Sequence, residues 1–194
     1  MEHEIVETGP GPNKPFEMIQ AVLGQAGIER EQVDRLIVGL GPGSYTGIRA
    51  AISLAQGWQL GRGIALSGLG SVECLVEGAQ AEAVTGRVAV VIDAQRGEFY
   101  LANYELSSAG CRQLQPLRLA TRDMVAKCEQ EGDLLLGPEM LNEFPKCRTM
   151  FPRAAVLAKL GLKQSKIVPG PQLEPIYLRA TSFVKAPPPR ILPE

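Results

Sequence analysis

The chain has 194 residues, of which 45% are hydrophobic and 21% charged, and its formal net charge is −1 at pH 7. This composition predicts a globular protein with a packed core, and the lack of a basic excess argues against tight nucleic-acid binding by this chain alone. The single histidine, His3, excludes zinc sites that need two histidines and leaves no well-held base for a Ser-His-Asp triad.

Alternating helix and strand signals cover residues 13–77 and predict an α/β fold. Apolar residues at helical spacing predict a first helix that begins near Pro15 and ends at Gly27. The further elements predicted here are a strand at 36–40 buried on both faces, a helix at 48–60 closed by Gly61, a short strand at 64–66, and a helix at 71–76 capped by Ser71 with Glu73 in its first turn.

The second half of the chain predicts a β-hairpin followed by further helix and strand segments. After a loop at 78–86, the predicted elements are strands at 88–92 and 99–106 joined by the turn 93–97, a helix at 122–131, a strand at 134–136 and a helix at 153–160 ended by Gly161. We therefore expect an N-terminal α/β lobe over residues 1–80, a C-terminal α/β lobe over 87–183 and an extended proline-rich tail over 184–194.

A glycine-rich loop joins the strand at 36–40 to the helix that follows it. The spacing matches neither a Walker A loop nor a dinucleotide fingerprint, since no lysine follows the last glycine and Ser44 stands where the third fingerprint glycine should be. The residues alone favour a rigid structural turn in which Ser44 or Thr46 caps the helix, over a loop whose N–H groups bind an anion. The candidate anion-binding residues are Gly41, Gly43, Ser44, Thr46 and Gly47.

The chain offers few groups for catalysis, so we predict no catalytic residue and no metal ligand. Ser44 and Thr46 have no adjacent base. Asp93 and Glu98 lie across a hairpin turn, where ion pairing with Arg96 in a solvated turn is the simpler interpretation.

The four cysteines, Cys74, Cys111, Cys128 and Cys147, form no C-x-x-C pair. Because the sequence also shows no signal peptide and no apolar run long enough for a membrane span, we expect free thiols, a cytoplasmic location and no membrane partner.

Three motifs, in order, resemble the TsaB (YeaZ) family, which works in making threonylcarbamoyladenosine on tRNA. The segment 41–49, Gly-Pro-Gly-Ser-Tyr-Thr-Gly-Ile-Arg, is similar to that family's glycine signature. The segment 93–100, Asp-Ala-Gln-Arg-Gly-Glu-Phe-Tyr, resembles its hairpin signature, with Gln95 replacing a basic residue, and 175–179, Pro-Ile-Tyr-Leu-Arg, resembles its C-terminal motif. The resemblance implies the actin/Hsp70/sugar-kinase (ribonuclease H-like) superfold with two lobes.

One departure from the family concerns the N-terminus. Members of the family usually open with an apolar strand that carries an Asp-Thr-Ser type turn, and a second strand, whereas this sequence begins almost at the first helix. We therefore expect an N-terminal lobe that is incomplete or reduced, with an exposed sheet edge or apolar face.

The resemblance implies a non-catalytic scaffold subunit that pairs with a catalytic TsaD subunit in tRNA N6-threonylcarbamoyladenosine modification. ATP and a metal ion are then expected on the TsaD partner and none on this chain alone. A TsaE-like ATPase is a further expected partner, a homodimer is an alternative state, and tRNA is expected only through the complex. The alternative functions are an independent ATP-binding enzyme or a glycoprotease-like peptidase of the same superfold.

The helix at 48–60 carries more apolar surface than one core-facing stripe requires, and several of its residues are small. On the residues alone, a helix buried in its own domain and a helix that contacts a partner are equally good interpretations, and the resemblance favours the partner. The candidate interface residues are Ala51, Leu54, Ala55 and Trp58.

Overall fold

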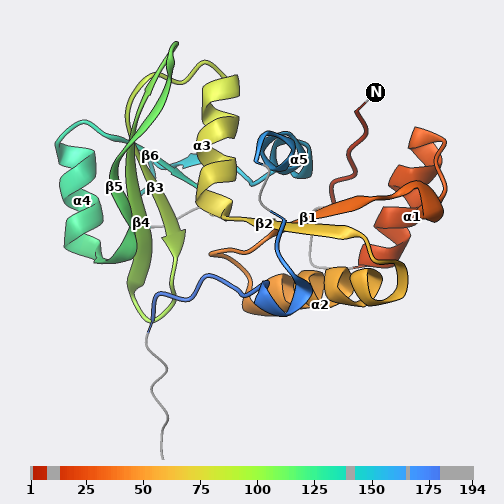
Figure 1. Cartoon of the computed structure of the whole chain (residues 1–194). Coiled ribbons are helices and arrows are strands. Elements are labelled where there is room, and N and C mark those ends of the chain that lie inside the picture. The colour runs from red at the N-terminus through yellow and green to blue at the C-terminus, as the bar shows by residue number, and fades with distance from the viewer. Residues whose placement is uncertain (1, 8–13, 139–142, 165–166, 180–194) are drawn as a thin grey trace, which may run out of the picture.

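A computed structural model describes residues 2–7, 14–138, 143–164 and 167–179. In this part of the chain, the helices and strands form two separate sheets with helices packed on them, which confirms the predicted α/β class (Figure 1). The elements are α1 (Pro15–Ala26), η1 (Arg30–Gln32), β1 (Arg35–Gly39), α2 (Tyr45–Arg62), β2 (Ala65–Leu69), α3 (Ser71–Ala81), β3 (Gly86–Asp93), β4 (Glu98–Ser107), β5 (Gly110–Thr121), α4 (Arg122–Gln130), β6 (Leu134–Gly137), β7 (Arg148–Thr149), α5 (Ala154–Lys163) and η2 (Gly170–Gln172).

The larger sheet has the strand order β5-β4-β3-β6-β7, with antiparallel pairing among the first three strands and parallel pairing from β3 to β6 and β7. Helix α3 covers one face and α4 the other (Figure 1). Because successive strand residues point to opposite faces, β3 contributes Val90 to the core under α3 and Val91 to the core under α4.

The smaller sheet consists of β1 and β2, paired in parallel with Val38 opposite Gly68. Helix α2 lies on one face and α5 on the other (Figure 1). The strand at 36–40 was expected to be buried on both faces, but of β1 only Val38 is fully buried. The reason is that β1 pairs with β2 alone among the described strands, so its second edge is open.

Two glycines that the sequence analysis places at helix ends lie inside helices. Helix α2 continues through Gly61 and ends at Gly63, whose φ of 68° gives the left-handed cap. Helix α5 continues through Gly161, which is buried, and a Cβ there would lie 2.4 Å from Ile37 Cδ1. Gly161 therefore allows close approach of α5 to β1 and does not end the helix.

The remaining predictions are partly confirmed. Helix α1 ends at a left-handed Gly27 (φ 65°), as predicted. The cap of α3 is Gly70 and not Ser71, and α3 runs on to Ala81, into the segment predicted as a loop. Strand β5 was not predicted at all. The tail from 184 lies outside the described residues.

Residues 167–176, which the sequence analysis assigns to the second lobe, pack on the first sheet. The Val168 amide donates to the Leu66 carbonyl (2.8 Å), and the Ile176 amide donates to the Leu40 carbonyl (2.9 Å). Leu173 is 3% exposed within the core formed by β1, β2 and α2. The C-terminal segment thus returns to the N-terminal lobe after α5. None of the helices in the described part of the chain has both the length and the hydropathy needed to cross a membrane.

The four cysteines are unpaired and differ in environment, so we predict that their thiols react at different rates. Cys111 is exposed, whereas burial raises the pKa of the Cys74 thiol and raises that of Cys147 to about 11. Because the thiolate is the reactive form, Ellman's reagent at pH 8 should modify Cys111 at least about tenfold faster than the other three. The C111S variant should lose the fast phase, and a fast phase that persists in it would contradict this assignment.

Candidate functional site

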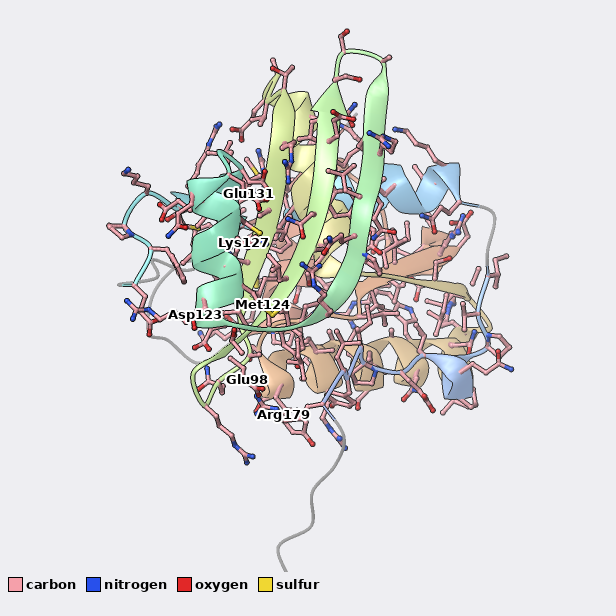
Figure 2. The ribbon with its side chains drawn as sticks, turned by 90° about the vertical axis from the view of Figure 1, so that its left-hand side faces the viewer. Glu98, Asp123, Met124, Lys127, Glu131 and Arg179 are labelled. Carbon is pink, nitrogen blue, oxygen red and sulfur yellow. The ribbon has the colours of Figure 1, made fainter. Side chains whose placement is uncertain are left out.

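Three segments that are far apart in the sequence meet near the ends of β1 and β2, beside the larger sheet (Figure 1). They are the glycine loop with the start of α2, the turn between β3 and β4, and the C-terminal segment 173–179. The guanidinium of Arg179 donates to the Gln95 carbonyl (3.1 Å) and to the Glu98 carboxylate (2.5 Å). Figure 2 shows Glu98 and Arg179 close together below the larger sheet. The fold therefore brings the three sequence motifs into one place.

The glycine loop is held tightly at its start. Gly41 has a φ of 90°, and a Cβ there would lie 2.6 Å from Ile48 Cδ1, so the position requires glycine. The Gly41 carbonyl accepts a hydrogen bond from the Ser71 amide (2.7 Å), which ties the loop to the start of α3. The peptide bond between Gly41 and Pro42 is cis. These contacts agree with the rigid structural turn that the sequence predicts for this loop.

Of the two predicted caps, Ser44 and Thr46, it is Ser44 that caps α2. Its Oγ accepts a hydrogen bond from the Gly47 amide at 3.3 Å, while Thr46 lies inside the first turn of the helix. The loop is exposed from Gly43 to Thr46. Four hollows in the described part of the chain lie beside α2, α4, α5 and the segment 148–154. Loop residues 41–47 line none of these four. Anion binding by Gly41, Gly43, Ser44, Thr46 and Gly47 stays a prediction.

An exposed cluster of two tyrosines and one arginine stands beside the loop. The Tyr45 and Tyr177 ring centroids lie 5.8 Å apart, and the Arg49 guanidinium lies 5.2 Å from the centre of the Tyr45 ring. Arg49 also donates to the Tyr45 hydroxyl (3.0 Å). The pKa of the Arg49 guanidinium is raised, mainly by its hydrogen bond to Tyr177 and next by the nearby Tyr45. The cluster presents a permanent positive charge on an aromatic surface that remains half-exposed or more.

The turn between β3 and β4 is built by its own polar groups. The Asp93 carboxylate accepts hydrogen bonds from the Gln95 amide (2.7 Å) and from Gln95 Nε2 (2.9 Å). Gln95, Arg96 and Gly97 all have positive φ values, of 64°, 61° and 75°. The ion pairing predicted for Asp93 and Glu98 with Arg96 is wrong, because Asp93 accepts from Gln95 and Glu98 pairs with Arg179 of the C-terminal segment.

Helix α2 presents an outer face that its own domain covers only in part. Ala51, Leu54 and Trp58 share this face at spacings of three and four residues; Ala51 is exposed, and the other two are half-buried. Leu54 and Trp58 line a hollow of about 450 Å³ together with Phe16 of α1. The fourth candidate interface residue, Ala55, is wrong: it is 1% exposed and packs toward β1 and β2.

Sequence reasoning missed three residues of this site, Arg49, Tyr177 and Arg179. All three lie inside the motifs that carry the family resemblance. The resemblance therefore identified their segments but did not identify these side chains as part of a site. No group of three or more His, Cys, Asp or Glu side chains gathers within residues 2–7, 14–138, 143–164 and 167–179.

The Arg179 contact predicts a local effect and not a global one. The two side chains are 29% and 43% exposed, and partly exposed ion pairs contribute about 0–1 kcal/mol. We expect R179A to lower the melting temperature by less than about 4 °C but to speed amide exchange over residues 173–179. R112A, which breaks the exposed pair with Glu105 on β4, should leave exchange in that segment unchanged. Equal protection in R179A and the parent would contradict a clamping role.

Comparison with known proteins places these motifs in a family context. A family model described as TsaD, tRNA N6-adenosine threonylcarbamoyltransferase, matches residues 15–165. The Escherichia coli (strain K12) tRNA threonylcarbamoyladenosine biosynthesis protein TsaB is 36% identical over 93 residues, which are 48% of this chain and 40% of that protein. The Bacillus subtilis (strain 168) protein of the same name is 28% identical over 98 residues, or 50% and 42% of the two chains. The chain thus spans about two fifths of the length of these curated relatives.

Solved structures show the same fold. YeaZ from Pseudomonas aeruginosa superposes with a TM-score of 0.70 at 24% identity, covering 84% of this chain and 82% of that one. A second structure, described as an uncharacterized protein with similarity to peptidase YEAZ from Pseudomonas aeruginosa, gives a TM-score of 0.69 at 25% identity with the same coverage.

Proposed function

The chain belongs to the family described as TsaD, tRNA N6-adenosine threonylcarbamoyltransferase, and to its TsaB (YeaZ) relatives, and from this premise we propose that it acts in tRNA N6-threonylcarbamoyladenosine biosynthesis as a non-catalytic subunit. Its fold is that of the actin/Hsp70/sugar-kinase superfold, as the resemblance implied. In the proposed complex this chain binds and positions a TsaD-like catalytic subunit, which holds the ATP and the metal ion.

The observation that carries the proposal is the outer face of α2. In a helix that only closes its own core the apolar residues are buried, yet on this face of α2 Ala51 is exposed and Leu54 and Trp58 are only half-buried. A Cβ added at Gly57 or Gly61 would meet nothing within 4 Å, so the backbone of α2 is open to close approach on this face. An uncovered helix face with apolar side chains and open glycines is suited to close packing against a helix of another subunit.

The proposal includes further partners. A TsaE-like ATPase joins the complex, tRNA binds through the complex and not through this chain alone, and the same α2 face supports a homodimer when the TsaD-like subunit is absent. The net charge of −1 supports an indirect role for this chain in tRNA binding. The setting of such a reaction is the cytoplasm.

The geometry of the site gives less support to two other functions, a peptidase and an independent ATPase. A peptidase with a Ser-His pair would need His3 near a hydroxyl, but His3 lines a groove with α1 and α5 that the loop residues Ser44 and Thr46 do not line. An independent ATPase would need the glycine loop to bind phosphate. In this loop the Ser44 hydroxyl already accepts a hydrogen bond from the Gly47 amide.

Reconstitution of tRNA modification tests the proposal. The cognate TsaD-like and TsaE-like subunits, ATP, Mg²⁺ and tRNA are assayed with and without this chain, and we expect product formation to depend on it. Calorimetry of the isolated chain with Mg-ATP should give no heat of binding. Full modification without the chain, or tight ATP binding by the chain alone, would overturn the assignment of a non-catalytic subunit.

A further inference from the structure

A small polar hollow lies on the α4 face of the larger sheet, away from the glycine loop and from α2. Its volume is about 370 Å³, and residues from β3, β4, β5 and α4 line it. Helix α4 covers only part of this face, and Figure 2 shows Met124, Lys127 and Glu131 along the helix beside the sheet. Its lining includes the charged side chains of Arg87, Arg118, Lys127 and Glu131, the amide of Asn103, and the apolar side chains of Leu114 and Met124.

Irregular pairing between β4 and β5 places two of these side chains. The register shifts between Leu101 and Asn103 and again between Asn103 and Tyr104, so β5 carries extra residues opposite Asn103. Such bulges re-aim side chains and terminate regular pairing. Arg118 pairs with Leu101, whose side chain lies in the core under α4, so Arg118 points to the same face as Asn103.

Asn103 is 5% exposed and its amide is fixed on both sides. Its Nδ2 donates to the Asp133 carboxylate (3.2 Å), and its Oδ1 accepts from Nη2 of Arg118 (3.0 Å). Only this orientation of the amide makes both contacts donor-acceptor pairs. Arg118 Nη1 also donates to the Pro116 carbonyl (3.3 Å), so the plane of the guanidinium is set before any ligand arrives.

The charges in the hollow are unequally balanced. Arg87 faces two carboxylates, those of Asp133 (2.9 Å) and Glu131 (3.5 Å), and Lys127 lies 3.8 Å from Glu131. Arg118 is half-buried, and within the described residues its bonds run to neutral oxygens and to no carboxylate. A half-buried guanidinium with a fixed plane and no counter-ion from the protein is suited to bind a planar or tetrahedral oxyanion.

The opposite wall of the hollow is apolar. Leu114 is half-buried on β5, and Met124 of α4 is 41% exposed. A short hydrocarbon segment attached to an oxyanion would lie against these two side chains. A small cleft with a few fixed polar groups and an apolar wall is the usual form of a small-molecule site.

We propose that the hollow between β5 and α4 binds the carboxylate or phosphate group of a small anionic molecule, with Arg118 as the primary ligand and Lys127 as a second cation at its rim. This site is separate from the proposed function, since it shares no residue with the glycine loop or the α2 face. It does not require the tRNA-modification partners.

The test is a titration of the ¹⁵N-labelled chain with sodium phosphate, sodium acetate and sodium butyrate, with sodium chloride at matched ionic strength as control. We expect saturable amide shifts around Leu114, Gln115, Arg118 and Lys127 with at least one oxyanion and none with chloride. Stronger binding of butyrate than of acetate and phosphate would identify a carboxylate with an apolar chain. Stronger binding of phosphate would identify a phosphate ester. Shifts confined to residues 41–47, or no saturable shift, would overturn the proposal.

Matched variants give a second readout. R118Q should weaken binding by roughly 10- to 100-fold, as expected for the loss of a charge-assisted contact, and R118K should fall between R118Q and the parent. R112Q, on the same strand but paired with Glu105 outside the hollow, should bind like the parent. If R118Q fails to fold, R118K against R112Q carries the comparison. Equal affinity of the folded Arg118 variants and the parent would overturn the assignment.

Discussion

Replacing Gly137 by alanine should destabilise the chain by about 3 kcal/mol, near the upper end for a single added methyl group. Gly137 ends β6, in the middle of the larger sheet between β3 and β7. A Cβ there would lie 2.2 Å from the carbonyl oxygen of Val91, a backbone atom that no side-chain rotation can move away. Relief would require β6 and β3 to separate, which breaks the pairing that holds β6 in the sheet.

Thermal unfolding measures this effect. For a chain of this size, about 3 kcal/mol corresponds to a fall in melting temperature on the order of 10 °C. The matched control is G57A on the outer face of α2, where a Cβ meets nothing within 4 Å. Because alanine is the better helix former by about 0.8–1 kcal/mol, G57A should raise stability slightly. Equal melting temperatures for G137A and G57A would contradict the packing seen around β6.

The glycines show where sequence reasoning succeeds and where it stops. Gly27 follows the last apolar residue of a helical stripe, and this local signal correctly predicts the end of α1. Gly61 and Gly161 give the same local signal but lie inside helices. At Gly161 the requirement comes from Ile37, more than a hundred positions away in the sequence, and a local pattern carries no information about such a neighbour.

Strand β5 escaped prediction for a different reason. The alternation of apolar and polar residues reveals a strand only where one face is buried, and β5 is an edge strand with half of its residues exposed and one buried. Its bulges opposite Asn103 disturb the period further. The proposed oxyanion site is formed by this strand, so the sequence alone could not place it.

The candidate site was predictable in its segments but not in its side chains. The cap at Ser44 depends only on residues within one helical turn, and it is one of the two caps that the sequence predicted. The contact of Arg179 with Glu98 joins residues from opposite ends of the second lobe and depends on the return of the C-terminal segment to the first sheet. On α2, helical spacing grouped Ala55 with the outer residues, although it is buried. A small side chain is compatible with a core and with an interface, so the residue type alone could not distinguish the two.

Replacing Ala51 by arginine should weaken association with the TsaD-like subunit at least about 100-fold and abolish the stimulation of tRNA modification, a loss of roughly 2.7 kcal/mol of binding free energy. Ala51 is exposed on the same face of α2 as Leu54 and Trp58, so the arginine side chain has room in the isolated chain. In a close helix-helix contact it would insert a long charged group where the proposed partner must approach. The measurement is calorimetry with the purified TsaD-like subunit, followed by the reconstituted assay.

Ala51 is a sharper probe of this interface than Trp58. Trp58 packs against the core formed by α2, β1 and β2, so its removal would change stability as well as association. The matched control is A109R at the exposed turn between β4 and β5, which adds the same side chain far from α2. A109R should fold, bind and stimulate like the parent, and A51R should fold like both. If A51R binds the TsaD-like subunit with parental affinity, the α2 face is not its interface; if A51R and A109R lose binding equally, the added charge and not its position is responsible. Loss in A51R alone, with parental melting temperatures for both variants, places the partner on the outer face of α2.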